Sequence, residues 1–186
     1  MRTYYMTTTI NSLLDAILKT EGGYVNNPND KGGETNWGVT IAVARENGYA
    51  GPMREMSRQQ ATEIYRNIYF FKPKFDRVMT LSAPIAAELF DTGVNMGVGT
   101  ASKFLQRSLN VLNRRQKDYT DIAADGVIGN ATLNALAAYL KRRGDVGETR
   151  ILRALNALQG ARYIELCEKR EANEEFMFGW LDRVAL

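Results

Sequence analysis

Residues 21–40 of this 186-residue chain read EGGYVNNPNDKGGETNWGVT and separate two helical patterns. Glycines and the Asn-Pro-Asn-Asp cluster are turn residues, so the segment predicts a loop that doubles back as a small β-hairpin. The signal for strands is weak elsewhere, and most of the remaining chain has helical periodicity. The sequence therefore predicts a mainly α fold, with a small β-hairpin lobe after the first helix.

The helix before this loop ends close to an acidic residue. Its apolar positions recur at helical spacing and form one stripe: Ile10, Leu13, Leu14, Ile17 and Leu18. Gly22 and Gly23 then favour termination of the helix, which leaves Glu21 at its C-terminal edge. The negative end of a helix dipole and partial burial both disfavour ionisation there. Glu21 is therefore a candidate general acid, although a solvated glutamate at a helix end is the ordinary alternative.

The loop also supplies a second carboxylate and a hydroxyl. Eight residues separate Glu21 from Asp30, and four more separate Asp30 from Thr35. A turn would bring Asp30 back opposite Glu21, where it could stabilise a positively charged sugar or activate a water that Thr35 positions. The structural alternatives are an Asx turn at Asp30 and a plain strand residue at Thr35. Glu34 is a rival second carboxylate, and Thr40 is a rival hydroxyl.

The same residues resemble a known family. Glu21–Pro28, Asp30–Thr35 and Trp37–Thr40 resemble the start of glycoside hydrolase family 108, N-acetylmuramidases found mainly as bacteriophage endolysins. The resemblance implies a lysozyme-like helical body in which Glu21 is the catalytic acid. The Glu/Asp/Thr spacing is also similar to that of certain phage lysozymes, where the gap from Asp to Thr is one residue longer.

Three further residues are candidates for substrate binding. Tyr24 and Trp37 could stack on the apolar faces of sugar rings, or could instead pack the hairpin onto the helical body. Packing is the preferred interpretation for Trp37. Asn95 is placed at a helix end before glycines and is a candidate for the floor of a cleft.

The second half of the chain resembles the peptidoglycan-binding region that follows the catalytic motif in family 108. The residues that carry this resemblance are Phe90–Gly97 and Asp125–Thr132. We therefore divide the chain into a catalytic region, 1–89, and a peptidoglycan-binding-like region, 90–186. No Pro/Gly/Ser-rich linker separates them, so we expect them to pack as one body.

Several helix boundaries follow from capping signals. Thr40 predicts a helix through Glu46, and Ser57 with Gln60 forms a capping box. Further helices are expected from Ser82 with Pro84, from a Thr100 cap, from Asn130 to Gly144, and from about Glu148 to Ala172. The last of these is expected to bury Ile151, Leu152, Leu155, Leu158 and Ile164.

Composition excludes several kinds of chemistry. The chain has no histidine, which removes Ser-His-Asp and Cys-His catalysis and His-ligated zinc. The single Cys167 excludes an internal disulfide framework. No apolar run is long enough to span a bilayer. We expect no cofactor and no metal, peptidoglycan rather than nucleic acid as the partner, and a monomer.

Two features bear on partners and delivery. The net charge of +3 suits an anionic polymer, but the basic clusters Arg114–Arg115 and Lys141–Arg143 end helical patterns, where cations favour the dipole. Residues 1–6 carry no apolar segment typical of a signal peptide. We expect the protein to remain in the host cytoplasm until holin-type release, and then to act in the periplasm and on the cell wall.

The resemblance to family 108 implies hydrolysis of the β-1,4 bond between N-acetylmuramic acid and N-acetylglucosamine, and the similarity to those phage lysozymes favours inversion. Two alternatives remain at this level. A lytic transglycosylase would use one acid and form an anhydro sugar, without need of Asp30 or Thr35. A non-catalytic peptidoglycan-binding phage protein would release no reducing ends.

Overall fold

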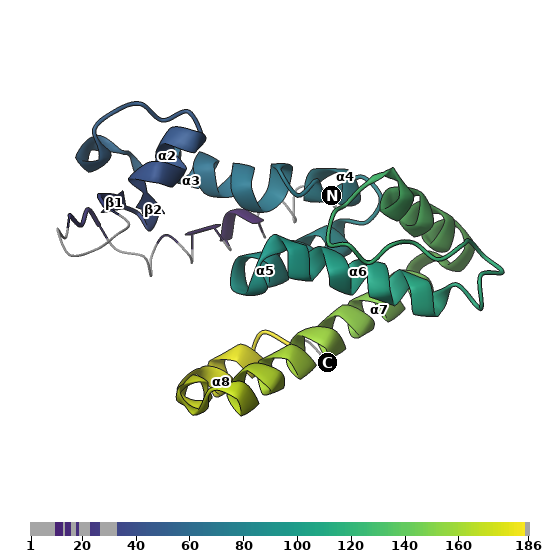
Figure 1. Cartoon of the computed structure of the whole chain (residues 1–186). Helices are drawn as coiled ribbons and strands as arrows, with labels where there is room; N and C mark the ends of the chain where they lie inside the picture. Colours follow the sequence, from purple (N-terminus) through teal and green to yellow (C-terminus); the bar gives the residue numbers. More distant parts are fainter. Residues whose placement is uncertain (1–9, 13, 16–17, 19–22, 27–32, 185–186) are drawn as a thin grey trace. The chain divides into compact units, whose positions relative to one another are not determined.

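The computed structural model describes residues 10–12, 14–15, 18, 23–26 and 33–184. The chain forms two compact units, of residues 1–72 and 73–186 (Figure 1). The predicted mainly α class is confirmed, and the described sheet has only two short strands. The predicted boundary at residue 89 stays a prediction.

The first unit contains the predicted first helix. Residues 10–12, 14, 15 and 18 are helical, while Leu13 and Ile17 of the predicted stripe lie outside the described residues. Ile10, Leu14 and Leu18 are buried, as expected for one face of a packed helix.

This first helix is tied to α3, Arg58–Arg66, by two polar contacts. Nη2 of Arg58 donates to Oδ1 of Asp15 at 2.7 Å, and Nη2 of Arg66 donates to Oδ1 of Asn11 at 3.0 Å. The later residue of the first helix contacts the earlier residue of α3, so the two helices run antiparallel.

The hairpin consists of β1, Thr35–Asn36, and β2, Val39–Thr40. Trp37 and Gly38 connect them, and both have positive φ, 53° and 74°. Two such residues in a two-residue connection are the requirement of a type I′ turn, whose twist matches that of the strands. Glycine adopts this conformation readily, whereas a tryptophan there needs support from its surroundings.

The predicted caps hold the rest of this unit. Thr40 caps α2, Ile41–Glu46, and Ser57 forms the capping box of α3 with Gln60. A 3-10 turn, η1, covers Met53–Glu55 and lies beside the hairpin. After α3 the helix widens into a π-turn, η2, at Asn67–Phe71, where the Lys72 amide donates to the Asn67 carbonyl.

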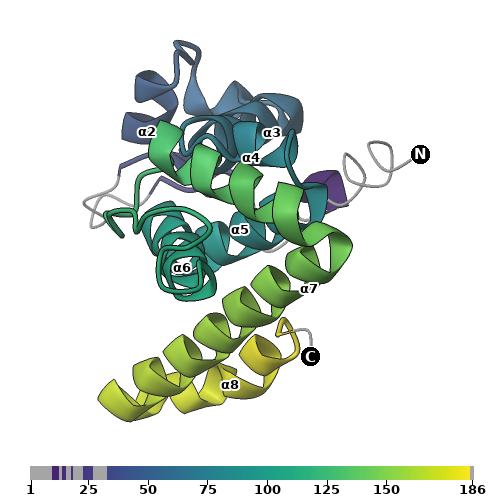
Figure 2. The ribbon, with the colours of Figure 1, turned by 90° about the vertical axis from the view of Figure 1, so that its right-hand side faces the viewer.

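The second unit is a helical assembly. Its elements are α4 (Phe75–Met79), α5 (Ala83–Met96), α6 (Val98–Leu112), α7 (Asn130–Lys169), η3 (Glu171–Asn173) and α8 (Glu174–Leu181). Helix α5 packs on α4, α6 and α7, and α8 folds back along the second half of α7 (Figure 2). The core includes Ile85, Leu89, Phe90, Leu105 and Leu109, all nearly inaccessible to solvent.

Two predictions about the helices of this unit were wrong, and one was confirmed. Helix α6 begins at Val98, not after a Thr100 cap, because Gly97 takes the capping position with φ 88°. The break expected at Gly144 is confirmed, because this glycine adopts the non-helical φ 54° and ψ −148° and α7 consists of two helices that meet there at a kink. Ile164, expected in the core, is 49% exposed.

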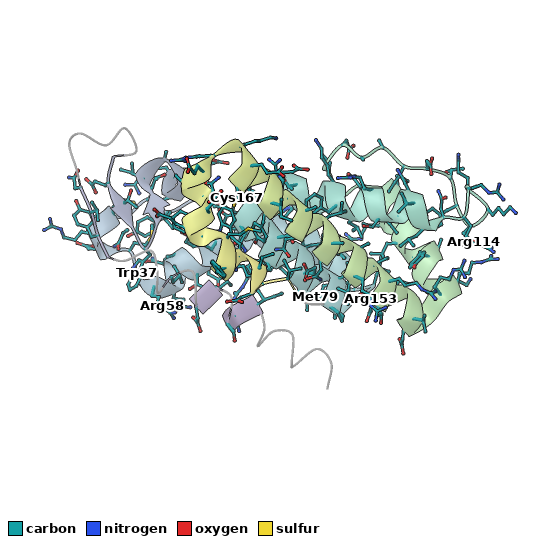
Figure 3. All side chains as sticks on the ribbon, turned by 90° about the horizontal axis from the view of Figure 1, so that it is seen from below. Trp37, Arg58, Met79, Arg114, Arg153 and Cys167 are labelled. Carbon is teal, nitrogen blue, oxygen red and sulfur yellow. The ribbon has the colours of Figure 1, made fainter. Side chains whose placement is uncertain are left out.

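The two basic clusters converge on one acidic residue. Arg114, Arg142 and Arg143 all form ion pairs with Asp118, at 2.6, 3.0 and 3.3 Å. Arg114 begins a left-handed run of three residues after α6, at the end of the unit remote from Cys167 (Figure 3). These guanidinium groups hold the pKa of Asp118 below its usual range, the Arg114 hydrogen bond contributing most. Arg114, Arg142 and Arg143 therefore have a structural role.

Among the described residues, no helix is both long and apolar enough to cross a membrane.

Candidate active site

The predicted site residues are distributed unevenly over the structure. Glu21 and Asp30 lie outside the described residues. Tyr24, Thr35 and Trp37 belong to the first unit, and Asn95 belongs to the second. The described part of the site is therefore the hairpin and the segments bonded to it.

Thr35 lies at the centre of a small three-segment ladder. Its amide donates to the Val25 carbonyl at 2.9 Å, and the Val25 amide donates back to the Thr35 carbonyl at 2.8 Å. On its other side Thr35 is the register partner of Thr40. Residues directly opposite each other in a ladder present their side chains to the same face. Val25, Thr35 and Thr40 therefore share one face of the hairpin.

The opposite face of the hairpin is buried. Asn36 and Val39 are 4% and 3% exposed. Nδ2 of Asn36 donates to the Met53 carbonyl at 2.7 Å, which anchors the hairpin to η1. Because successive strand residues point to opposite faces, this anchor directs Thr35 away from the core.

The two candidate hydroxyls, of Thr35 and Thr40, differ in their hydrogen bonding. Oγ1 of Thr40 accepts a hydrogen bond from the Val43 amide at 3.4 Å and caps α2. Among the residues that the structure describes, the Thr35 hydroxyl has no such structural partner, and Thr35 is half-buried. Thr40 is thus committed to the cap of α2, and the choice between Thr35 and Thr40 as the group that could orient a water stays open.

Tyr24 packs against a cation. The Arg54 guanidinium lies over the Tyr24 ring, 4.9 Å from its centroid. Such a contact stabilises the loop by roughly 0.5–1 kcal/mol at an exposed site. One face of this ring is thus covered by Arg54 and is closed to a sugar.

Trp37 attaches the hairpin to the segment that follows η1. Its Nε1 donates to the Met56 carbonyl at 2.9 Å, and the side chain is half-buried. Asn95 is exposed on the last turn of α5, and its Nδ2 donates to the Asp91 carbonyl at 2.8 Å. The role of both residues in substrate binding stays a prediction.

Glu34, the rival carboxylate, immediately precedes β1. It is half-buried, and its carbonyl accepts a hydrogen bond from the Ile41 amide at 2.8 Å. This bond fixes the backbone of Glu34 within the hairpin. The choice between Asp30 and Glu34 stays open.

An open groove runs beside α3 in the same unit. It encloses about 810 Å³ and is lined by amide-bearing side chains, a tyrosine and an acid: Asn47, Tyr49, Gln59, Gln60, Glu63 and Asn67. Nδ2 of Asn67 donates to Oδ1 of Asn47 at 2.7 Å across it, and the π-turn begins at Asn67. Amides offer donors and acceptors together, which suits hydroxyl and acetamido groups of sugars. Sequence analysis missed this groove, because its residues come from separate segments.

Glu88 is a second feature that sequence analysis missed. Burial, with a smaller contribution from the Asp91 charge, raises its pKa to about 7. Its Oε1 is buried without a partner in the described part of the chain. The available signal was one acidic residue inside the apolar segment 85–90. Asn156 and Thr92 hydrogen-bond to this side chain, so it belongs to the packing of α5 against α7.

Known families match both halves of the chain. Residues 14–97 match the family described as Glycosyl hydrolase 108, and residues 100–185 match the family described as Predicted Peptidoglycan domain. The chain carries a glycosyl hydrolase 108 domain followed by a predicted peptidoglycan domain. The predicted family resemblance is confirmed. The hydrolase domain includes Glu21, Asp30, the hairpin and Asn95.

A solved structure supports this assignment. The "Structure of Brucella abortus SagA" is similar, with 27% identity, a TM-score of 0.58, and coverage of 96% of this chain and 90% of that one. No curated protein matches the chain. The two domains are those of a lysozyme-like glycoside hydrolase that acts on peptidoglycan. Within the described residues, no group of three or more His, Cys, Asp and Glu could hold a metal.

Proposed function

We propose that the chain hydrolyses the β-1,4 bond between N-acetylmuramic acid and N-acetylglucosamine, with Glu21 as the general acid. The observation that carries this proposal is the ladder in the hydrolase domain that pairs Thr35 with Val25. Val25 follows Glu21 by four residues, and Asp30 lies in the segment between the paired residues. The pairing of Val25 with Thr35 holds the two ends of this segment together, which supports a site formed by residues from both ends.

In the proposed reaction the Glu21 carboxyl donates its proton to the oxygen that leaves. A water attacks the anomeric carbon from the opposite side, and Asp30 accepts the proton that this water loses. The Thr35 hydroxyl forms one hydrogen bond with this water and so orients it for attack. The products are two shorter glycans, one with a new reducing end, and Glu21 regains its proton as Asp30 releases one.

The stereochemical outcome depends on the separation of the carboxyl groups. Roughly 6.5–9.5 Å leaves room for a water and inverts the anomeric carbon, whereas roughly 5–5.5 Å permits direct attack and retention. We propose inversion, because a hydroxyl at Thr35 that orients a water fits direct attack by this water on the anomeric carbon. Anomer analysis by NMR in the first minutes of digestion distinguishes the two.

The amide-lined groove supports a glycan as the ligand of this domain. Its open form and its mixture of amides with one tyrosine suit a chain of acetamido sugars better than a small apolar ligand. Gln59→Ala should raise KM for glycan strands and leave kcat nearly unchanged, and it spares the capping box formed by Gln60. An unchanged KM would remove the groove from the proposal.

The decisive experiment is mass analysis of purified peptidoglycan after digestion, with wild type beside Glu21→Gln. Hydrolysis gives fragments with new reducing ends, and Glu21→Gln should give none. A transglycosylase would give anhydro fragments lighter by one water, and a non-catalytic binder would release nothing. Glu34→Gln is the matched control and should retain activity if Asp30 is the second carboxylate.

We further propose that the protein acts as a monomeric phage endolysin. In this role it accumulates in the host cytoplasm and reaches the wall only after another protein opens the inner membrane. Expression in a bacterium with and without a co-expressed holin tests the route, with lysis expected only in the first case. Lysis without the holin would contradict the proposed route, and size-exclusion chromatography with light scattering tests the monomer.

A further inference from the structure

A second groove lies within the predicted peptidoglycan domain, between α6 and α7. It encloses about 290 Å³, and its lining combines three cations with an apolar base: Thr100, Lys103, Phe104, Arg107, Leu158, Ala161, Arg162 and Glu165. All of these residues fall within the matched range 100–185. The groove is therefore on the part of the chain whose family is named for peptidoglycan.

The charges in this groove are arranged at a cost to stability. Lys103 and Arg107 are four residues apart on α6 and share one face, where like charges repel. Arg162 faces them from α7, and Glu165 is the single acid of the lining. Nη1 of Arg162 donates to Oε2 of Glu165 at 2.8 Å, which neutralises one positive charge. The lining keeps a net charge of +2.

The base of the groove is apolar. Phe104 is 6% exposed and packs into the core between the two cations of α6. Leu158 and Ala161 continue this apolar surface on α7. An apolar base flanked by cations fits a ligand that has small apolar parts and separate negative groups.

The turn at Asp125–Gly126 supports Lys103. A Cβ on Gly126 would lie 3.3 Å from both Cγ and Cε of Lys103 and 2.8 Å from the Gly99 carbonyl oxygen. Lys103 lowers the pKa of Asp125, although hydrogen bonds from Val127 and Gln106 contribute more. This close approach gives the Asp125–Thr132 motif a structural purpose, because it packs a turn against the stem of a groove residue.

We propose that this groove binds the carboxylates of the peptide stems of peptidoglycan. Those stems carry free carboxylates on short, largely alanine-containing peptides, which complements a groove with two cations in excess over an apolar base. The inference rests on the proposed function, and it locates wall recognition on the second domain. Binding there would hold the enzyme on the wall between cleavages.

The test is a pelleting assay with purified sacculi that contain no teichoic acid. Full-length Glu21→Gln is used throughout, so that binding is measured without turnover. Adding Lys103→Gln, Arg107→Gln and Arg162→Gln should weaken binding about tenfold, because three exposed charge contacts are removed. Adding Arg153→Gln and Lys141→Gln instead removes exposed cations of α7 outside the groove and should leave binding within about twofold.

Sacculi whose carboxylates have been amidated provide the second arm. The parent protein should bind them about tenfold more weakly, and the groove variant should lose nothing further. Equal losses for the groove and control variants, or unchanged binding to amidated sacculi, would overturn the proposal. Rescue of binding only by sacculi that carry teichoic acid would assign the groove to phosphate instead.

Failure of this proposal is distinguishable from failure of the proposed function. The groove variant on the wild-type background should still produce reducing ends from soluble glycan fragments. If the groove proposal alone fails, that activity and its loss in Glu21→Gln are unaffected. If Glu21→Gln keeps full hydrolytic activity, the proposed function fails whatever the groove binds.

Discussion

Trp37 donates a hydrogen bond to the carbonyl oxygen of Met56 at 2.9 Å from a left-handed backbone position. This conformation costs a non-glycine residue roughly 1–2 kcal/mol, so it persists only where other contacts hold it. The indole bond and the Asn36–Met53 bond together fasten the hairpin to η1 and the residue that follows it. The orientation of Thr35 depends on this attachment.

Replacing Trp37 by phenylalanine tests the attachment. Trp37→Phe keeps an aromatic ring and removes the Nε1 donor, so the free energy of unfolding should fall by about 1 kcal/mol. Thermal denaturation followed by circular dichroism measures this loss. Wall-clearing activity should fall as well, because the hairpin becomes less firmly held. Unchanged stability would mean that the hydrogen bond does not hold the turn.

The two threonines of the hairpin should separate activity from stability. Thr35→Val preserves shape and removes the hydroxyl, so turnover should fall at least tenfold while the melting temperature stays nearly constant. Thr40→Val removes the cap of α2 and should cost about 0.5–1 kcal/mol of stability, with turnover per folded molecule retained. The opposite pattern would assign the water-orienting role to Thr40.

Local rules accounted for the first helix and for the beginnings of α2 and α3. The buried positions Ile10, Leu14 and Leu18 follow from helical periodicity, and the caps at Thr40 and Ser57 follow from hydroxyl chemistry. These signals depend on neighbours within one turn, which a sequence displays directly.

Features that depend on distant partners were less accessible. Ile164 follows the helical spacing of the apolar residues before it but is 49% exposed, because the face of α7 that is covered depends on how α5, α6 and α8 pack on it. The amide-lined groove is formed by the end of α2, by α3 and by the π-turn. The hydrogen bond between Asn47 and Asn67 could not be predicted from their spacing in the sequence. Glu88 shows the same limit, because its burial depends on helices that follow much later in the chain.

Alanine substitutions at two glycines separate the cost of backbone strain from the cost of a steric clash. Gly48 and Gly126 have similar positive φ values, 85° and 84°. A Cβ on Gly48 would have no heavy atom within 4 Å, whereas one on Gly126 would approach the Gly99 carbonyl oxygen to 2.8 Å. Gly48→Ala should therefore cost about 1 kcal/mol from backbone strain alone.

Gly126→Ala should cost about 2 kcal/mol more than Gly48→Ala, because the turn must move away from α6. Urea denaturation of both variants provides the comparison. The Gly126 variant should also bind sacculi more weakly, since the Lys103 stem loses its packing against the turn. Equal losses in the free energy of unfolding for the two substitutions would show that the turn moves away from α6 at no further cost.

Glu88 makes the stability of the second unit depend on pH. Its pKa is raised from 4.5 to about 7 in the folded protein, so the folded state binds this proton more tightly than the unfolded state. The free energy of unfolding should therefore decrease as pH rises from about 4.5 to 7, by up to about 3 kcal/mol. Below pH 4.5 the free energy of unfolding does not change with pH through this group. Above pH 7 the carboxylate is ionised in both states, and the full cost of burying its charge remains.

Glu88→Gln removes this charge while it keeps the size of the side chain. The variant should be more stable than wild type by about 3 kcal/mol at pH 8 and nearly equal at pH 4.5, because only the ionised carboxylate is penalised by burial. Urea denaturation at both pH values measures the difference. Glu168→Gln, at an exposed position of α7, controls for the general loss of a negative charge and should show no such pH-dependent gain. A variant less stable than wild type at pH 8 would mean that Glu88 is held as a stabilising anion, and the Asn156 and Thr92 hydrogen bonds would then outweigh its desolvation.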